Sequence, residues 1–203
     1  SAPYWRHHPR LLNWQKNICE RQRLGLPVKH FKQKAQEMSH SNSPSPQQSL
    51  SASQKRQKLR QVFTGTDCLT PASVHDALSA RVAQIIGHQI GMLGGSVASA
   101  VTLSAPDLTV LTLSELAQCV RAICRTSNLA LFVDADHGYG NALSVGRTIE
   151  ELEHAGAAGC SIEDTLLPAR FGATQEELIS CDEMLAKLHA AVRAKQEIGR
   201  AHV

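Results

Sequence analysis

From residue 52 onward, short apolar runs alternate with amphipathic helical patterns. Four of the runs have the length of buried strands and end at glycine or polar residues. These predicted strands are 68–74, 89–93, 129–133 and 158–162. Because strands that alternate with helices pair side by side in one direction, the pattern predicts a parallel α/β sheet.

The helices between the strands are predicted from apolar stripes and capping residues. In 112–126 the stripe is clear, and either Thr112 or Ser114 can serve as the N-cap. Asp76 is expected to cap a helix that Gly87 ends. The remaining predicted helices are 53–62, 143–154 and 181–195.

Polar side chains follow the last three predicted strands directly. Ser96 comes after the second strand, Asp134 and Asp136 after the third, and Glu163 and Asp164 after the fourth. The carboxyl ends of the strands are the face at which (β/α)₈ barrels build their active sites. A closed barrel typically needs about 250 residues. The pattern therefore leaves two folds open, an open doubly wound sheet or a barrel cut short.

The segment 132–141, FVDADHGYGN, carries the strongest chemical signal. Asp134 and Asp136 leave the strand on one face because the side chains of a strand alternate with a period of two. Glycines in the following loop let the backbone approach a bound group. Two carboxylates at the end of a buried strand cost free energy unless a cation lies between them. We therefore predict a hard divalent cation here, Mg²⁺ with Mn²⁺ as the alternative. The purely structural interpretation is a turn acid and a helix cap.

Composition is that of a globular protein, with 42% hydrophobic and 19% charged residues. No apolar run approaches the roughly 18 residues of a membrane helix, so no membrane partner is expected. The six cysteines lack CxxC and zinc-ligand spacings, and most lie among apolar residues. This usage is typical of free thiols in a reducing compartment, so we expect a cytoplasmic protein.

Charge is distributed unevenly behind the net value of +3. Residues 1–60 hold twelve Lys/Arg against two Asp/Glu, and residues 61–203 hold nine against sixteen. Three interpretations of residues 1–37 remain open: a mitochondrial transit peptide, a nucleic-acid-binding arm, and translated sequence upstream of an initiator Met38. We favour the last, and because no motif supports the arm we expect no nucleic-acid partner. The Ser/Pro/Gln-rich segment 39–52 is expected to be disordered.

The chain is thus expected to have three parts. Residues 1–52 form a disordered or non-native leader, and residues 53–196 form a partial barrel domain. Residues 197–203, EIGRAHV, have no helical stripe or strand character and can be encoded by a common sequencing-adapter sequence, so we interpret them as a non-native tail. A sheet left unclosed after four units exposes an edge and an apolar face. We therefore expect this chain by itself to be inactive.

Four motifs follow one another between about Thr64 and Lys195. They are LGGSVAS (93–99), LTLSE (111–115), DADHGYGN (134–141) and IEDTLLPARFG (162–172). Together they resemble the isocitrate lyase/phosphoenolpyruvate mutase superfamily, and most closely its oxaloacetate decarboxylase branch. The resemblance implies a (β/α)₈ TIM barrel, here truncated after about four units. It also implies a Mg²⁺-dependent homo-oligomer, a dimer or tetramer, that acts on small 2-oxo acids.

The resemblance further implies roles for individual residues. Asp134 would be the direct Mg²⁺ ligand and, with Ser96, a catalytic residue. Ser96 and the backbone of Gly95 would bind the substrate carboxylate. The acids that would hold the ion through water are Asp107, Asp136 and Glu163. An arginine, a histidine and a tyrosine that the superfamily carries later would lie beyond Gln196.

Departures from the superfamily pattern narrow the reaction. The loop 166–172 contains no cysteine or histidine, so carbon–carbon lysis of the 2-methylisocitrate type lacks its acid. The lysine and the Asn-Ser pair of the mutase branch are absent there as well. The prediction is therefore decarboxylation of oxaloacetate, or a related 2-oxo acid, to pyruvate and CO₂. The alternatives are a phosphonopyruvate hydrolase or mutase, a 2-methylisocitrate-type lyase, and an inactive fragment.

Four further residues have mainly structural interpretations. His137 is expected to be a hydrogen-bonding residue rather than a base, and Cys160 a small core residue. Tyr139 either lines the mouth of a pocket or packs beneath the loop. Asp164 is expected to cap the chain locally or to pair with Arg170.

Overall fold

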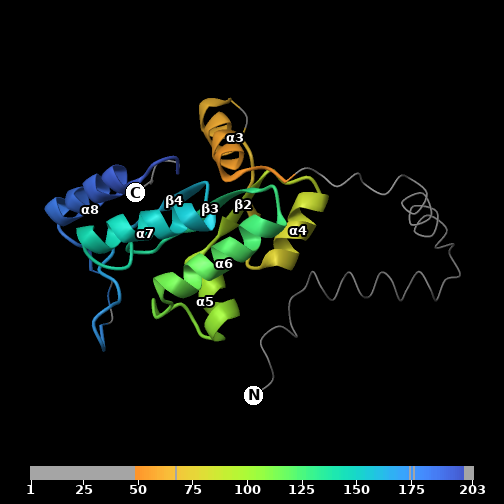
Figure 1. Ribbon diagram of the computed structural model, residues 1–203. Coiled ribbons are helices and arrows are strands. Elements are labelled where there is room, and N and C mark those ends of the chain that lie inside the picture. Colours follow the sequence, from red (N-terminus) through yellow and green to blue (C-terminus); the bar gives the residue numbers. More distant parts are fainter. Residues whose placement is uncertain (1–48, 67, 174, 176, 199–203) are drawn as a thin grey trace, which may run out of the picture. The chain divides into compact units, whose positions relative to one another are not determined.

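The computed structural model describes residues 49–66, 68–173, 175 and 177–198. Its centre is a four-stranded sheet in which every pairing is parallel and the strand order follows the chain (Figure 1). The strands are β1 (Ala72–Ser73), β2 (Ile90–Leu93), β3 (Ala130–Asp134) and β4 (Gly159–Ser161). The predicted parallel α/β fold is confirmed. Strand β1 is shorter than predicted, because 68–70 have no regular structure and are exposed.

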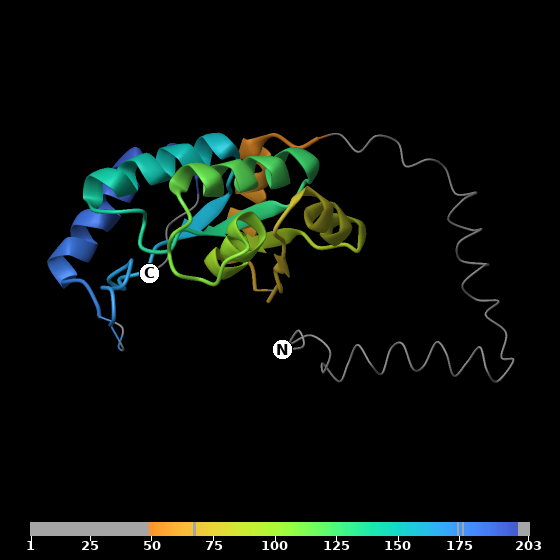
Figure 2. The same cartoon turned by 90° about the horizontal axis from the view of Figure 1, so that it is seen from below.

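Six helices accompany the sheet in the described residues. They are α3 (Ala52–Thr64), α4 (Ala77–Ile85), α5 (Gly95–Leu103), α6 (Leu113–Thr126), α7 (Ala142–Ala155) and α8 (Cys181–Ala194). Helices α4, α6, α7 and α8 pack in that order beside one another, as the two views of the ribbon show (Figures 1 and 2). The helices therefore repeat the order of the strands, as strand–helix units require.

Local sequence explains where most helices begin and end. Asp76 caps α4 and exchanges hydrogen bonds with Ser79, and Thr112 does the same with Glu115 at the start of α6. Thr112 is thus the N-cap, and Ser114 is not. Helix α7 ends at Gly156, whose φ of 102° suits glycine.

The sequence pattern did not predict α5. Gly94 is the N-cap of this helix, and Gly95 and Ser96 form its first turn. The nine residues, GSVASAVTL, show no polar face, and Gly, Val and Thr are weak helix formers. Neither periodicity nor propensity therefore revealed the helix.

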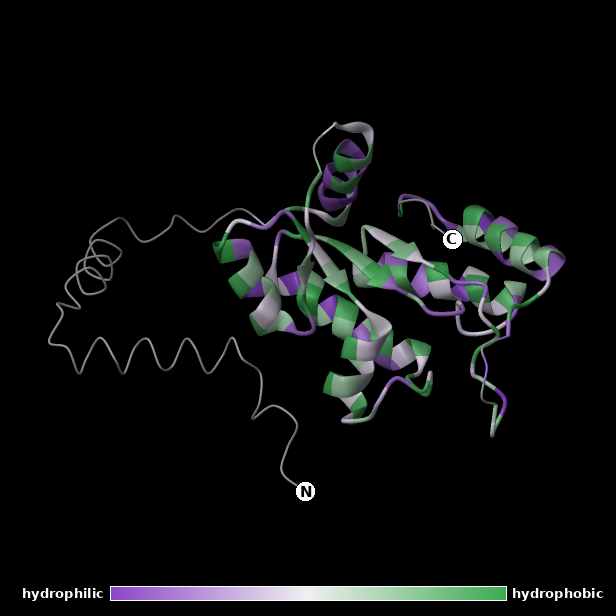
Figure 3. Ribbon diagram, turned by 180° about the vertical axis from the view of Figure 1, so that it is seen from behind, coloured by the Kyte–Doolittle hydropathy of each residue, from purple (hydrophilic) through white to green (hydrophobic). Residues whose placement is uncertain are grey.

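The two faces of the sheet are covered differently. Leu93, Val133 and Cys160 lie in register and belong to the core that the sheet shares with α4, α6 and α7. On the opposite face, Leu59 of α3 packs against the residues that begin or precede the strands, namely Ile90, Ala130 and Ala158. Helix α3 therefore covers the amino ends of the strands. Helix α5 begins just after the carboxyl end of β2 and lies on the other side of the sheet from α3 (Figures 1 and 2). Figure 3 shows apolar residues along the strands and recurring in each helix.

Two buried cations fix α3 to the ends of neighbouring helices. Lys55 donates from Nζ to the carbonyl oxygens of Cys124 and Ser127, at 2.6 and 2.7 Å. Arg56 donates to the carbonyl oxygens of Ala157 and Glu153, at 3.0 and 2.6 Å. These carbonyls lie at the C-termini of α6 and α7, where unpaired oxygens and the helix dipole favour a positive charge.

Replacing Arg56 with methionine is expected to lower the free energy of unfolding by about 3 kcal/mol. The change leaves two carbonyls and the Glu153 carboxylate, which lies 3.7 Å from the guanidinium and is 12% exposed, without their cation. Urea unfolding followed by circular dichroism measures the effect. Gln57→Met, at the exposed next position, is the matched control. A loss below about 1 kcal/mol for Arg56→Met would contradict this account of α3.

Three further sequence expectations meet the structure here. None of the helices in the described ranges is long and apolar enough to cross a membrane. The five described cysteines are free thiols. Burial raises the pKa of Cys124 to about 11 and that of Cys160 to about 12, whereas Cys68 and Cys181 are exposed.

The predicted leader lies almost entirely outside the described residues, and its nature stays a prediction. Of the predicted tail, Glu197 and Ile198 are described. The Glu197 carboxylate accepts from Arg56 at 3.0 Å, and the Ile198 side chain is 2% exposed. The non-native origin of 197–203 stays a prediction as well.

Candidate functional site

Polar residues from three strand tips meet at the carboxyl edge of the sheet. Asp134 is the last residue of β3 and lies in register with Ser161, the last residue of β4. Gly95 begins α5 immediately after β2, and its N–H donates to Asp134 Oδ2 at 3.5 Å. Glu163 follows β4, and its N–H donates to the carbonyl oxygen of Asp136 at 2.8 Å. The parallel sheet thus brings together residues that are far apart in the chain.

Three donors orient the Asp134 carboxylate. Asp136 N–H and the Ser161 hydroxyl donate to Oδ1 at 3.3 and 3.4 Å, and Gly95 N–H approaches Oδ2. Bonds of this length are weak, so the carboxylate is oriented while its oxygens keep lone pairs for another ligand.

The electrostatics of Asp136 show that four carboxyl groups converge. Burial, followed by the charges of Asp134, Asp107 and Glu163, raises the pKa of Asp136 from 3.8 to about 7. Asp107 reaches this edge from the 104–112 loop between α5 and α6. No ion pair of the described residues involves Asp134 or Asp136. The cluster therefore carries negative charge that these side chains alone do not neutralise.

The residues at this edge fit a hard divalent cation. All four carboxyl groups offer oxygen, the donor type that Mg²⁺ prefers, and neither Asp134 nor Asp136 has an ion-pair partner among the described residues. A Cβ placed on Gly95 would lie 2.3 Å from Asp136 Oδ1, so a residue without a side chain is needed there. Among the described residues, no group of three or more His, Cys, Asp or Glu side chains could hold an ion directly. The predicted arrangement, with Asp134 as the direct ligand and the other acids acting through water, does not require such a group.

The remaining predicted contacts stay predictions. Ser96 is exposed in the first turn of α5 and directly follows Gly95, which contacts Asp134. The backbone N–H of Gly95 is directed at Asp134 rather than open to a substrate. Asp107 and Glu163 are exposed, as acids that act through water would be. The predicted pairing of Asp164 with Arg170 is replaced by an ion pair between Arg170 and Glu177, at 3.6 Å.

Sequence reasoning missed Ser161 as a site residue and left the role of Tyr139 undecided. The register of β3 with β4 decides the role of Ser161, and no local signal reveals it. Tyr139 packs against the core beneath the loop, and its hydroxyl is buried without a partner among the described residues. Burial raises the pKa of Tyr139 above its ordinary range, as do the charges of Asp136 and Asp134, so the phenol stays protonated. It is therefore a hydrogen-bond donor next to the acids.

His137 is buried in the same loop. Burial lowers its pKa, and the Lys187 ammonium lowers it further, so the imidazole is neutral at pH 7. Its Nδ1 has no hydrogen-bond partner among the described residues, although its ring lies 5.8 Å from that of Tyr139. The expected hydrogen bond is therefore not made at Nδ1.

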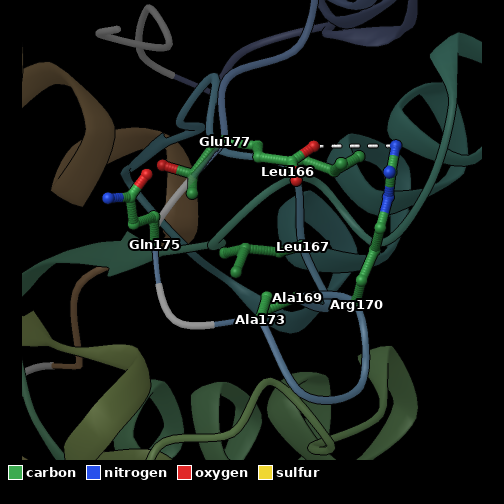
Figure 4. A pocket seen from close by; sticks show the side chains of 8 residues that line it. Leu166, Leu167, Ala169, Arg170, Ala173, Gln175 and Glu177 are labelled. Atoms are coloured by element: carbon green, nitrogen blue, oxygen red, sulfur yellow. Dashed lines mark ion pairs between the residues drawn. The ribbon is translucent and has the colours of Figure 1, made fainter.

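The loop after β4 encloses a separate pocket of about 200 Å³. Figure 4 shows its lining, including Leu166, Leu167 and Ala173, with the Arg170 guanidinium reaching across to the Glu177 carboxylate. The acids of the strand tips do not line it. We therefore assign the candidate chemistry to the carboxyl edge of the sheet rather than to this pocket.

The metal-free protein is expected to lose stability as pH rises from about 4 to 7. The folded-state pKa of Asp136, about 7, exceeds the ordinary 3.8. The folded state therefore binds a proton that the unfolded chain releases, and this contribution is complete at low pH and lost near pH 7. Because Asp136 is partly exposed, we expect only roughly 1–2 kcal/mol.

Urea unfolding of the wild type and of Asp136→Asn, both in EDTA between pH 4 and 8, isolates the contribution of Asp136 to stability. The variant cannot ionise at this position, so the difference between the two proteins should grow with pH. Parallel pH profiles for wild type and variant would show that Asp136 keeps an ordinary pKa.

Comparisons with known proteins agree with the motifs. Residues 59–203 match the family described as phosphoenolpyruvate phosphomutase. The oxaloacetate decarboxylase of Bradyrhizobium diazoefficiens is 52% identical over 143 residues, which are 70% of this chain and 50% of that protein. The chain spans about half the length of the curated relatives it matches.

Two enzymes are among the solved structures that this chain resembles. Oxaloacetate acetylhydrolase, in complex with 3,3-difluorooxalacetate, is 32% identical with a TM-score of 0.64 over 70% of this chain and 49% of that one. Phosphonopyruvate hydrolase, in complex with oxalate and Mg²⁺, is 29% identical with a TM-score of 0.62 over 70% and 48% of the two chains. These similarities confirm the resemblance drawn from the four motifs.

Proposed function

Because this chain belongs to the phosphoenolpyruvate mutase family, we propose that it takes part in the Mg²⁺-dependent decarboxylation of oxaloacetate to pyruvate and CO₂. One observation carries the proposal most directly. Burial, together with the charges of Asp134, Asp107 and Glu163, raises the pKa of Asp136 to about 7, so acids from three segments of the chain form one edge suited to a cation. A related 2-oxo acid would present the same chemistry.

The chain's own residues would hold the ion and the substrate. Asp134 would be the direct ligand, and Asp107, Asp136 and Glu163 would act through water. Ser96, in the first turn of α5, would contact the substrate carboxylate, since helix N-termini favour anions. When bound, the cation supplies a Lewis acid for the negative charge that develops on the 2-oxo oxygen.

The reaction needs no covalent nucleophile. Cleavage of the bond between C3 and C4 releases CO₂ and leaves its electron pair on the pyruvate fragment as an enolate, which then takes one proton at C3. The buried Tyr139 hydroxyl stays protonated beneath the loop, so it adds no negative charge to the acidic edge. Hydrogen bonds from Asp136 and Ser161 already orient the Asp134 carboxylate, so it need not turn during the reaction.

The loop after β4 favours decarboxylation over lysis of the 2-methylisocitrate type. Residues 166–172 provide no cysteine or histidine that could act as the acid of a lyase. The similarity to oxaloacetate acetylhydrolase suggests one competing outcome with the same substrate, hydrolysis to oxalate and acetate. The products distinguish the two reactions.

We also propose that the protein self-associates and acts in the cytoplasm. Helix α4 and its C-cap expose four apolar side chains, which suit burial against another protein surface. They are Leu78, Val82, Ile85 and Ile86, each at least half exposed. Light scattering after size exclusion would measure the oligomeric state.

A coupled assay tests the proposed function. Pyruvate released from oxaloacetate is measured with lactate dehydrogenase and NADH, with Mg²⁺ or with EDTA, on the 203-residue chain and on any longer product of the same gene. The rate without protein is subtracted because free divalent ions also promote decarboxylation. Mg²⁺-dependent pyruvate release supports the proposal, and oxalate with acetate as the products would replace it with hydrolysis. If neither reaction occurs and Mn²⁺ does not bind, the proposed function is wrong.

A further inference from the structure

The loop that carries the candidate metal ligands has an unusual backbone. Asp136 and Tyr139 adopt left-handed conformations, with φ of 45° and 64°, and Gly138 and Gly140 have φ of 80° and 140°. A non-glycine residue in this region costs free energy of order 1 kcal/mol or more, and persists only where its surroundings hold it. The structure must therefore contain groups that fix this loop.

Two buried side chains from the helices behind the loop bind its carbonyl oxygens. Lys187 of α8 donates from Nζ to the carbonyl oxygen of His137 at 3.1 Å. Thr148 of α7 donates from Oγ1 to the carbonyl oxygen of Gly138 at 2.9 Å. Helices α7 and α8 pack against each other, so they form one support for two successive peptide groups.

Lys187 occupies a position at which packing alone would favour an apolar residue. The buried face of α8 consists of Met184, Lys187 and Ala191, and Lys187 is only 3% exposed. Burying an ammonium group is costly unless it makes a specific interaction. The ammonium group donates to the carbonyl oxygen of His137, the residue next to Asp136, which points to a role in shaping the loop.

We propose that Lys187 is a positioning residue for the divalent-cation site. Through the His137 carbonyl it fixes the backbone on either side of that residue, and so keeps the Asp136 carboxylate turned toward Asp134. The inference rests on the proposed function, since it assigns Lys187 to that same metal centre. Removing such a support of a metal ligand typically costs 10–100-fold in affinity.

The protein contains a matched control for a buried lysine. Lys55 of α3 is also 3% exposed, and its ammonium group also donates to backbone carbonyls, those of Cys124 and Ser127. It lies at the amino ends of the strands, away from the loop. A loss of stability alone would therefore affect Lys187→Met and Lys55→Met alike, whereas the proposed role concerns Lys187 only.

The experiment measures binding of Mn²⁺ alone, by electron paramagnetic resonance of the free ion, together with thermal unfolding in EDTA. We expect Lys187→Met to weaken Mn²⁺ binding at least about tenfold, Lys187→Arg to restore part of it, and Lys55→Met to bind as wild type does. Thr148→Val, which removes the adjacent hydrogen bond with little change in volume, should weaken binding to a smaller degree. If Lys187→Met fails to fold, Thr148→Val tests the same support of the loop.

Three results would overturn the inference. Wild-type affinity in a folded Lys187→Met protein would do so, as would equal losses in Lys187→Met and Lys55→Met. If Lys187→Met does not fold, wild-type affinity in Thr148→Val would have the same consequence. A wild type that binds no Mn²⁺ would instead refute the proposed metal centre, and the inference with it.

Discussion

In a longer product of the same gene that releases pyruvate, replacing Asp134 with alanine is expected to abolish the Mg²⁺-dependent activity while the fold persists. Asp134 is the direct ligand in the proposed centre, and a Lewis acid at a developing anion contributes several kcal/mol. Since each 1.4 kcal/mol corresponds to a factor of ten, the rate should fall at least about 10³-fold. Mn²⁺ binding should be lost in parallel, which can be measured even where turnover is absent.

The fold should persist because the change removes a charge from a crowded acidic cluster. With one negative charge fewer, the pKa of Asp136 should fall toward its ordinary value, because Asp134 is one of the charges that raise it. Asp134→Asn keeps the shape and an oxygen for the Ser161 and Asp136 donors, and should lose binding in the same way.

Asp164→Ala is the control for the loss of an acid at a strand tip. Asp164 follows Glu163 in the chain but is not among the charges that raise the pKa of Asp136. It should keep Mn²⁺ binding close to that of wild type. Undiminished Mg²⁺-dependent turnover in Asp134→Ala would rule out the assignment of the metal ligand.

Replacing Gly95 with alanine is the second change for which we expect a large effect. The new Cβ would lie 2.3 Å from Oδ1 and 3.1 Å from Cγ of Asp136, so that carboxylate must turn away from the cluster. We expect Mn²⁺ affinity to fall at least about tenfold, as for loss of an outer ligand. Helix α5 itself should tolerate the change, because alanine is a better helix former than glycine by roughly 0.5–1 kcal/mol.

Gly94→Ala separates a steric effect on Asp136 from a general effect on the glycine pair. A Cβ at Gly94 would meet nothing within 4 Å, and its φ of −82° is accessible to alanine. We therefore expect Gly94→Ala to bind Mn²⁺ as wild type does. Isothermal titration with Mn²⁺ and thermal unfolding report binding and stability separately. Equal behaviour of the two variants would contradict the packing of Gly95 against Asp136.

Much of the fold could be predicted because it depends on local chemistry. Apolar runs marked the four strands, and the capping residues Asp76 and Thr112 marked helix starts, since both signals depend on residues close together in the chain. The parallel arrangement followed from the alternation of strands and helices. Helix α5 escaped because a helix with apolar residues on every side carries no periodic signal.

The candidate site could be predicted only in part. The sequence placed Asp134, Asp136 and Glu163 after strands, and side-by-side strands of a parallel sheet carry such residues to one edge. It gave no reason to place Ser161 beside Asp134, which follows from the register of β3 with β4. Lys187 would be assigned to the solvent face of α8 by its residue type, whereas it is buried and donates to the His137 carbonyl.

By itself, then, the sequence determined the order and type of most elements and the acids at the strand tips, because propensity, capping and periodicity act within a few residues. Tertiary structure decided which groups meet. The raised pKa of Asp136, the close approach of Gly95 and the bond from Lys187 to the His137 carbonyl depend on segments far apart in the chain. Packing sets those distances, and no local pattern encodes them.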